Sequence, residues 1–213
     1  MFVIYLHGFA SSAASTKASH FAAKLRARGI PLHTPDLNEP DFSTLTVSRM
    51  VQQVTDAVDR LPKTTDVVLI GSSLGGLVAV HVARQRPDRI GRVILLAPAL
   101  EFGGKAPPAL GDRDLAQWRA TGSTNVFHYG YGRILPVGYE LYADACTYGC
   151  SEVRLSMPIQ IFQGRNDTVV DPDSVERWAA TRPNVDLHMV DDDHQLGRSL
   201  DYIWSESARF LGL

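Results

Sequence analysis

The pentapeptide Gly-Ser-Ser-Leu-Gly, residues 71–75, joins a strand-like run to a helix-like run. It matches the G-x-S-x-G pattern of a sharp strand-to-helix turn, which holds a serine in a strained conformation with its hydroxyl exposed above a sheet edge. A side chain two residues before or after that serine would collide across the turn, so glycine is needed at both positions. Ser73 has both glycines, whereas Ile70 and Leu74 occupy these positions around Ser72. The spacing therefore predicts Ser73 as a nucleophile.

Two other interpretations of this pentapeptide can be compared with that one. A Gly/Ser-rich turn without chemical importance would fit the composition equally well. A phosphate-binding loop would not, because the chain contains neither G-x-G-x-x-G nor G-K-[ST]. The apolar strand before the turn and the helix after it favour the nucleophile.

A serine nucleophile needs an adjacent base, usually a histidine that a third group orients. Of the seven histidines, His194 lies just beyond the last predicted strand in a polar turn. His188 lies within that strand, where we expect it in the core. Four further histidines lack a position at a strand end: His20, His33, His81 and His128. We therefore expect His194 to be the base, and a surface histidine is the alternative.

The orienting group should be a carboxylate at another strand end. Residues 163–170 directly follow a predicted strand, and Asp167 among them satisfies the chain order Ser, Asp, His. Asp171 in the same loop is the main rival, and Glu101 is a more distant one. The acidic run 191–193 is expected to be solvated or to bind nearby backbone, with a metal-binding cluster as the alternative.

The elements that must position these residues alternate along the chain. Buried or half-buried strands are predicted at residues 2–6, 31–35, 66–71, 92–97, 159–163 and 185–190, and helices at 15–29, 45–61, 74–86, 173–181 and 195–211. This alternation predicts an α/β fold with a mostly parallel, doubly wound sheet of about five strands, with the short, proline-bounded run 31–35 at or near a sheet edge. The 213 residues fit a single domain, 1–213.

Residues 100–155 interrupt the alternation with no predicted sheet strand and with two short helical pieces, 114–119 and 139–145. The segment follows a strand directly, so it should lie over the ligand edge of the sheet as a cap. Its aromatic residues predict an apolar substrate pocket, with Phe127 and Tyr131 as binding residues and flexibility at Gly130 and Gly132. A decorative insertion is the alternative.

Composition narrows the range of partners. Lys and Arg total 21 against 23 Asp and Glu, a net charge of −2, which favours neither nucleic acid nor an anionic membrane. No signal-like or membrane-spanning run is present, so we expect a cytoplasmic location. Cys146 and Cys150 have no companion pair or nearby histidine cluster, so no metal site is expected.

Three motifs together resemble the α/β-hydrolase superfamily: His-Gly-Phe at 7–9, Gly-Ser-Ser-Leu-Gly at 71–75, and a late Asp followed by His. Within it, Tyr-Leu-His-Gly-Phe-Ala-Ser-Ser at 5–12 and Asp-Asp-Asp-His-Gln-Leu at 191–196 resemble the small bacterial YqiA-like esterases. The two N-terminal strands usual in the superfamily are absent, which implies a minimal α/β-hydrolase fold with a helical cap.

An oxyanion hole needs two N–H donors. The geometry of the turn predicts the amide of Leu74 as one, and the resemblance implies Phe9 as the second and a structural role for His7. The expected function is a serine hydrolase that cleaves a small-molecule acyl ester through an acyl-serine, without a cofactor. An acyltransferase, thioesterase or perhydrolase would use the same triad, and a non-catalytic binding protein is a further alternative. The sequence predicts no oligomeric state.

Overall fold

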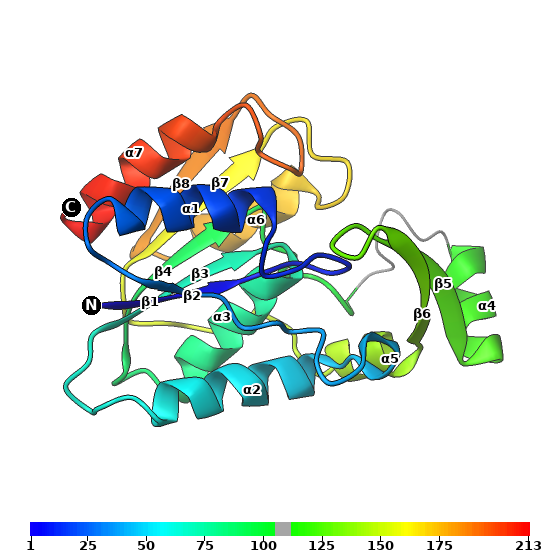
Figure 1. Ribbon diagram of the computed structural model, residues 1–213. Coiled ribbons are helices and arrows are strands. Elements are labelled where there is room, and N and C mark those ends of the chain that lie inside the picture. Colours follow the sequence, from blue (N-terminus) through cyan, green and yellow to red (C-terminus); the bar gives the residue numbers. More distant parts are fainter. Residues whose placement is uncertain (105–111) are drawn as a thin grey trace.

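The computed structural model describes residues 1–104 and 112–213. Its centre is a parallel sheet in the order β2-β1-β3-β4-β7-β8 (Figure 1). These strands are β1 (Phe2–Leu6), β2 (Leu32–His33), β3 (Val67–Ser72), β4 (Ile90–Leu96), β7 (Ile159–Gly164) and β8 (Val185–Val190). The predicted α/β fold with its parallel, doubly wound sheet is confirmed, with six strands in place of about five. The shortest is the edge strand β2, which pairs with β1 over only two residues.

Helices cover both faces of the sheet. The face covered by α1 (Thr16–Arg26) and α7 (Leu200–Leu211) buries Val68 and Ile70 of β3, whereas Leu69 points into the opposite core. That opposite core is covered by α2 (Val47–Asp59), α3 (Leu74–Gln85) and α6 (Pro172–Ala180). The alternation follows from the two-residue period of a strand, and it makes each buried strand apolar on both sides.

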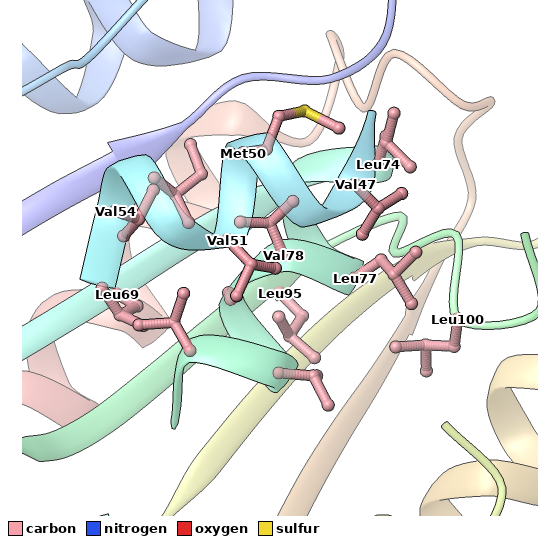
Figure 2. Packing of buried hydrophobic residues seen from close by; sticks show 14 of the residues in the cluster. Val47, Met50, Val51, Val54, Leu69, Leu74, Leu77, Val78, Leu95 and Leu100 are labelled. Carbon is pink, nitrogen blue, oxygen red and sulfur yellow. The ribbon is translucent and has the colours of Figure 1, made fainter. Parts of the chain in front are cut away.

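Helix α2 shows how the sequence forms these layers. The Thr46 side chain caps its N-terminus by accepting a hydrogen bond from the amide of Arg49 at 3.1 Å. Its apolar residues recur at helical spacing and are buried: Val47, Met50, Val51, Val54 and Val58. Figure 2 shows this face packed against Leu77 and Val78 of α3, so that α3 is enclosed between α2 and the sheet.

The segment 100–155 contains a hairpin that the sequence analysis missed. The described elements of this segment are α4 (Asp112–Thr121), β5 (Ser123–His128), β6 (Arg133–Gly138) and α5 (Glu140–Ala145). One further short element, the 3-10 helix η1 (Phe42–Thr44), lies in the N-terminal half. Strands β5 and β6 form a separate antiparallel pair. Because β5 contains Asn125 and β6 contains Pro136, their sequences do not resemble that of a buried strand. A two-stranded ribbon has free edges, and these tolerate proline. Residues 105–111, which were also assigned to the cap, lie outside the described residues.

In Figure 1 this hairpin lies at the end of the sheet where the parallel strands finish, and both chain termini lie at the opposite end. Its tip is attached to the loop after β1, because the amide of Tyr129 donates to the carbonyl oxygen of Ala10 at 2.8 Å. The insertion therefore shares the edge of the sheet at which the loops after β3, β7 and β8 emerge. No helix in the described part of the chain is long and apolar enough to cross a membrane.

Candidate active site

Ser73 stands in the turn between β3 and α3 with a φ of 52° and a ψ of −119°. A non-glycine residue rarely adopts a positive φ, and such strain persists where the surrounding structure imposes it. Here the Ser73 amide donates to the carbonyl oxygen of Leu96 at 2.9 Å, and the Ser73 carbonyl accepts from Gly76 at 2.8 Å and Ala99 at 3.0 Å. Three backbone hydrogen bonds thus hold the serine in its strained conformation.

The glycines on either side of Ser73 are required by backbone contacts. A Cβ atom on Gly71 would lie 2.7 Å from the Cα atom of Gly76. On Gly75 it would lie 2.7 Å from the carbonyl oxygen of His7, and closer still to that of Leu6. These approaches are too short for any side chain, so the G-x-S-x-G spacing reflects packing of the turn against α3 and β1.

The structure brings Ser73, Asp167 and His194 together from the loops after β3, β7 and β8. His194 Nε2 lies 3.1 Å from Ser73 Oγ, and His194 Nδ1 lies 2.8 Å from Asp167 Oδ2. The Asp167 side chain is wholly buried and that of His194 is 14% exposed. The rival Asp171 instead caps α6, where it accepts from the amide of Asp173 at 3.1 Å. Glu101 is exposed.

The contacts of Asp167 favour its ionised form. Oδ1 accepts from the amides of Val169 at 2.8 Å and Val170 at 2.9 Å, and Oδ2 accepts from Gln163 Nε2 at 2.9 Å. Burial alone would raise the pKa of Asp167, but the hydrogen bonds from His194 and the two amides outweigh it and hold that pKa below its usual value. A carboxylate only accepts, so His194 donates from Nδ1 and presents the lone pair of Nε2 to Ser73. Gln163 was not predicted, because a glutamine inside a buried strand gives no distinct signal.

The acidic run before His194 shapes its loop. Asp192 accepts hydrogen bonds from the amides of Asp193 and Ser199, each at 2.9 Å, and Asp193 accepts from the amide of Gln195 at 2.8 Å. These carboxylates bind nearby backbone, which is the arrangement expected from the sequence. In the described ranges, no group of three or more His, Cys, Asp or Glu residues could hold a metal ion.

The loop after β1 runs directly against Ser73. A Cβ atom on Gly8 would lie 3.0 Å from the Ser73 Cβ atom, so the backbone before Phe9 passes beside the serine. His7 is buried and fixes this loop, because its Nε2 accepts from the amide of Leu37 at 2.9 Å and its Nδ1 lies 2.9 Å from the carbonyl oxygen of Gly8. Leu74 is the first residue of α3.

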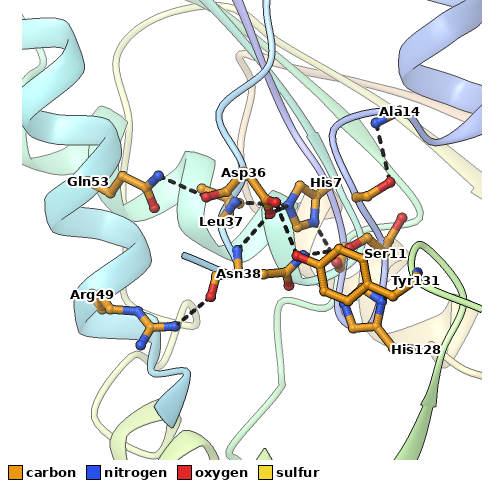
Figure 3. A network of polar contacts seen from close by, with 12 residues as sticks. His7, Ser11, Ala14, Asp36, Leu37, Asn38, Arg49, Gln53, His128 and Tyr131 are labelled. Atoms are coloured by element: carbon orange, nitrogen blue, oxygen red, sulfur yellow. Dashed lines mark hydrogen bonds and ion pairs between the residues drawn. The ribbon is translucent and has the colours of Figure 1, made fainter. Parts of the chain in front are cut away.

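Figure 3 shows polar contacts that join the hairpin tip to the loop after β2, and that loop to the one after β1. The Tyr131 hydroxyl donates to Asp36 Oδ2 at 3.2 Å, and Asn38 Nδ2 donates to the carbonyl oxygen of Ser11 at 2.9 Å. The Tyr131 ring stacks on His128, with 4.0 Å between ring centroids. In the described structure, the Tyr131 side chain therefore contacts Asp36 in the loop after β2 and His128 at the end of β5, and no contact with Ser73 is recorded.

The other aromatic residue predicted to bind substrate, Phe127, is 48% exposed and contacts the Tyr129 ring edge at 5.1 Å between centroids. A cavity of about 390 Å³ lies between the hairpin and the loop before α2. Its lining consists of Asn38, Glu39, Pro40, Asp41, Phe42, Ser43, Tyr131, Arg133, Leu135 and Pro136. Tyr131 lines this cavity, whereas Ser73, Asp167 and His194 do not.

Comparison with known proteins places this geometry in a structural context. The chain is similar to Est1E from Butyrivibrio proteoclasticus, solved with ferulic acid bound, with a TM-score of 0.81 and 19% identity over 99% of this chain and 87% of that one. It is also similar to mouse alpha/beta hydrolase domain-containing protein 10, with a TM-score of 0.77 and 19% identity over 99% of this chain and 89% of that one. Both similarities show that the chain has the predicted α/β-hydrolase fold.

A curated relative, the lipase LipV of Mycobacterium tuberculosis, is 33% identical over 91 residues, which are 41% of this chain and 34% of LipV. The match thus spans about a third of that relative. The model of one protein family extends much further, over residues 2–210. The chain belongs to this family, the Uncharacterised protein family UPF0227, in agreement with the resemblance to YqiA-like α/β hydrolases.

Proposed function

We propose that the protein is a serine hydrolase that cleaves carboxylic esters of small molecules through Ser73, His194 and Asp167. The observation that carries this proposal is the hydrogen-bonded series from Asp167 to His194 to Ser73, with the serine on a strained turn. The α/β-hydrolase fold and the lipase and esterase relatives support the broader class of ester hydrolases. Fold alone would not specify the reaction, because one fold can carry many functions.

The mechanism follows from the positions of these side chains. Ser73 Oγ attacks the ester carbonyl carbon while His194 Nε2 takes the hydroxyl proton, and the carbonyl oxygen becomes negatively charged. The amides of Leu74 and Phe9 would stabilise that oxygen. His194 then returns the proton to the leaving alcohol, which leaves an acyl-serine. In the second half, His194 activates water, and hydrolysis releases the acid.

We further propose that the segment 100–155 acts as a cap on the single domain 1–213 and influences the acyl preference of the enzyme. Its hairpin lies at the end of the sheet where the triad loops emerge, and the hairpin tip contacts Ala10 next to Phe9. Phe127 and Tyr131 would supply apolar contact area. Tyr131 would also brace the loop after β2 through its hydrogen bond with Asp36.

The experiment that tests the function combines active-site labelling with turnover. A fluorophosphonate should form an adduct on Ser73 that mass spectrometry of peptides locates, and p-nitrophenyl esters should be hydrolysed. Ser73→Ala should abolish labelling and lower kcat by several orders of magnitude. Ser72→Ala is the matched control, because Ser72 belongs to β3 and is 4% exposed. Labelling of Ser72, or no labelling of the folded protein, would overturn the assignment.

The alternative acyl acceptors require a separate measurement on the same protein. A panel of p-nitrophenyl esters and acyl thioesters, each with and without a competing alcohol or peroxide, separates hydrolysis from acyl transfer and perhydrolysis. A hydrolase should form the free acid at a rate that a competing acceptor hardly changes. Preferential formation of the new ester or peracid would replace hydrolysis by acyl transfer or perhydrolysis on the same triad.

A further inference from the structure

Lys17, the second residue of α1, is a buried lysine beside the candidate triad. Only 8% of its surface is exposed. A buried ammonium group costs free energy unless hydrogen bonds or charges compensate it. Its Nζ donates to the carbonyl oxygen of His194 at 3.3 Å and to that of Gln195 at 3.1 Å. The lysine therefore links the first helix to the loop after β8, 177 positions further along the chain.

Other hydrogen bonds of the loop after β8 connect it within itself and to the loop after β7. The Asp193 carboxylate shapes the loop internally, and the carbonyl oxygen of Asp192 accepts from the amide of Asn166 at 3.0 Å, which joins the loop to the one after β7. Lys17 attaches the loop to α1, and it does so at the residue that carries the imidazole. A helix that packs on the sheet thus supports the backbone of His194 directly.

We propose that Lys17 is a positioning residue for the base: its ammonium group holds the carbonyl oxygens of His194 and Gln195 and so sets the approach of His194 to Ser73. The inference rests on the proposed function. The two imidazole contacts, 3.1 Å to Ser73 and 2.8 Å to Asp167, both depend on where the His194 backbone lies. A displacement of about 1 Å in a catalytic group can cost about a hundredfold in rate.

The charges around Lys17 determine how this support should respond to pH. The charged groups near its ammonium are the carboxylates of Asp167, Asp192 and Asp193. Burial lowers the pKa of Lys17 to about 8, although the three carboxylates act in the opposite direction. Hydrogen bonds from a charged donor are stronger than those from a neutral amine. The hold on His194 should therefore weaken as the pH rises through about 8.

The test compares Lys17→Met with Lys24→Met, using p-nitrophenyl acetate. Lys24 lies on the same helix, but its side chain is 39% exposed and pairs with Asp201 at 3.0 Å on the surface. Lys17→Met should lower kcat by about tenfold to a hundredfold with little change in KM, because a misplaced base slows the chemical step. Lys24→Met should behave like the parent, because surface ion pairs contribute little. Lys17→Arg, which stays charged, should recover part of kcat and remove the alkaline fall in activity.

Two outcomes would overturn the proposal. One is a folded Lys17→Met protein with the parent's kcat and the parent's pH profile. The other concerns the parent protein and applies even if circular dichroism shows that Lys17→Met does not fold. The parent's kcat should fall around pH 8 while the protein stays folded, and a kcat that is constant up to about pH 10 refutes the role of Lys17. The proposed function fails separately, when the parent neither hydrolyses esters nor reacts with a fluorophosphonate at Ser73.

Discussion

Asp167→Asn should disable the proposed triad while leaving its shape nearly unchanged. All four recorded partners of the carboxylate are N–H donors: the amides of Val169 and Val170, the amide group of Gln163, and the Nδ1–H of His194. Asparagine replaces one acceptor oxygen by an NH2 group, which is a donor. If that group faces Val169 and Val170, both of these backbone amides lose their acceptor. The more favourable orientation turns it toward Gln163 and His194.

In that orientation, His194 must accept at Nδ1, so its proton moves to Nε2. An Nε2–H group cannot take the proton of Ser73, which lies 3.1 Å away. Since the side chain of residue 167 is wholly buried, water cannot replace the lost acceptor. The wrong tautomer in a comparable triad costs about ten-thousandfold in kcat, or about 5.5 kcal/mol of transition-state stabilisation.

The assay is steady-state hydrolysis of a p-nitrophenyl ester by purified Asp167→Asn and Asp171→Asn, with folding checked by circular dichroism and thermal unfolding. Asp171 caps α6 and its side chain is 50% exposed, so its replacement should cost about 1 kcal/mol of stability at most and leave kcat nearly unchanged. If Asp171→Asn is the inactive variant, or if Asp167→Asn keeps more than about a tenth of the parent's kcat, the orienting role assigned to Asp167 is wrong.

Three further predictions concern stability and specificity. Burial lowers the pKa of Lys17 from 10.5 to about 8, so the unfolded chain binds this proton more tightly and the free energy of unfolding should rise by about 3 kcal/mol between these pH values. Burial raises the pKa of the Cys150 thiol to about 12, so this group lowers the free energy of unfolding as the pH rises above 9. Urea titrations at several pH values should therefore compare the parent with Lys17→Met. If the free energy of unfolding has the same slope against pH in both proteins, the linkage to Lys17 is refuted. Gly75→Ala should lower the free energy of unfolding by about 1–3 kcal/mol, because the added methyl group would overlap the backbone at the end of β1. Gly197→Ala is the control and should be tolerated, since nothing lies within 4 Å of the added atom. Equal losses of stability in thermal unfolding of the two variants would contradict this. Phe127→Ala should shift the preferred acyl chain length gradually, because each methylene in such a pocket changes the transition-state free energy by about 1–3 kcal/mol at most, and fluorophosphonate labelling of Ser73 should stay intact. If the chain-length profile is unchanged and the oligomeric mass changes instead, the segment is an interface.

Local sequence was sufficient wherever the controlling interactions are short-range. The apolar run at 67–70 and Gly71 predict the strand and the turn, because a side chain on Gly71 would collide with the backbone of Gly75 and Gly76, within a few positions of the serine. The helix predicted from residue 15 also begins there, because the Ser15 side chain caps it by accepting from the amide of Ala18. In each case the residue and its partner are close in sequence, so the pattern carries the information.

Tertiary structure decided what depends on distant partners. Asp167 and Asp171 are both carboxylates in one loop, and only the fold places Asp167 within 2.8 Å of His194. The link from Lys17 to the His194 loop joins elements from opposite ends of the chain, and a lysine near a helix start gives no sign of it. The hairpin β5–β6 was missed because its strands pair only with each other, outside the buried sheet whose hydrophobic pattern revealed the other strands. Such pairings depend on chain topology, which brings together residues whose local sequences show no mutual preference.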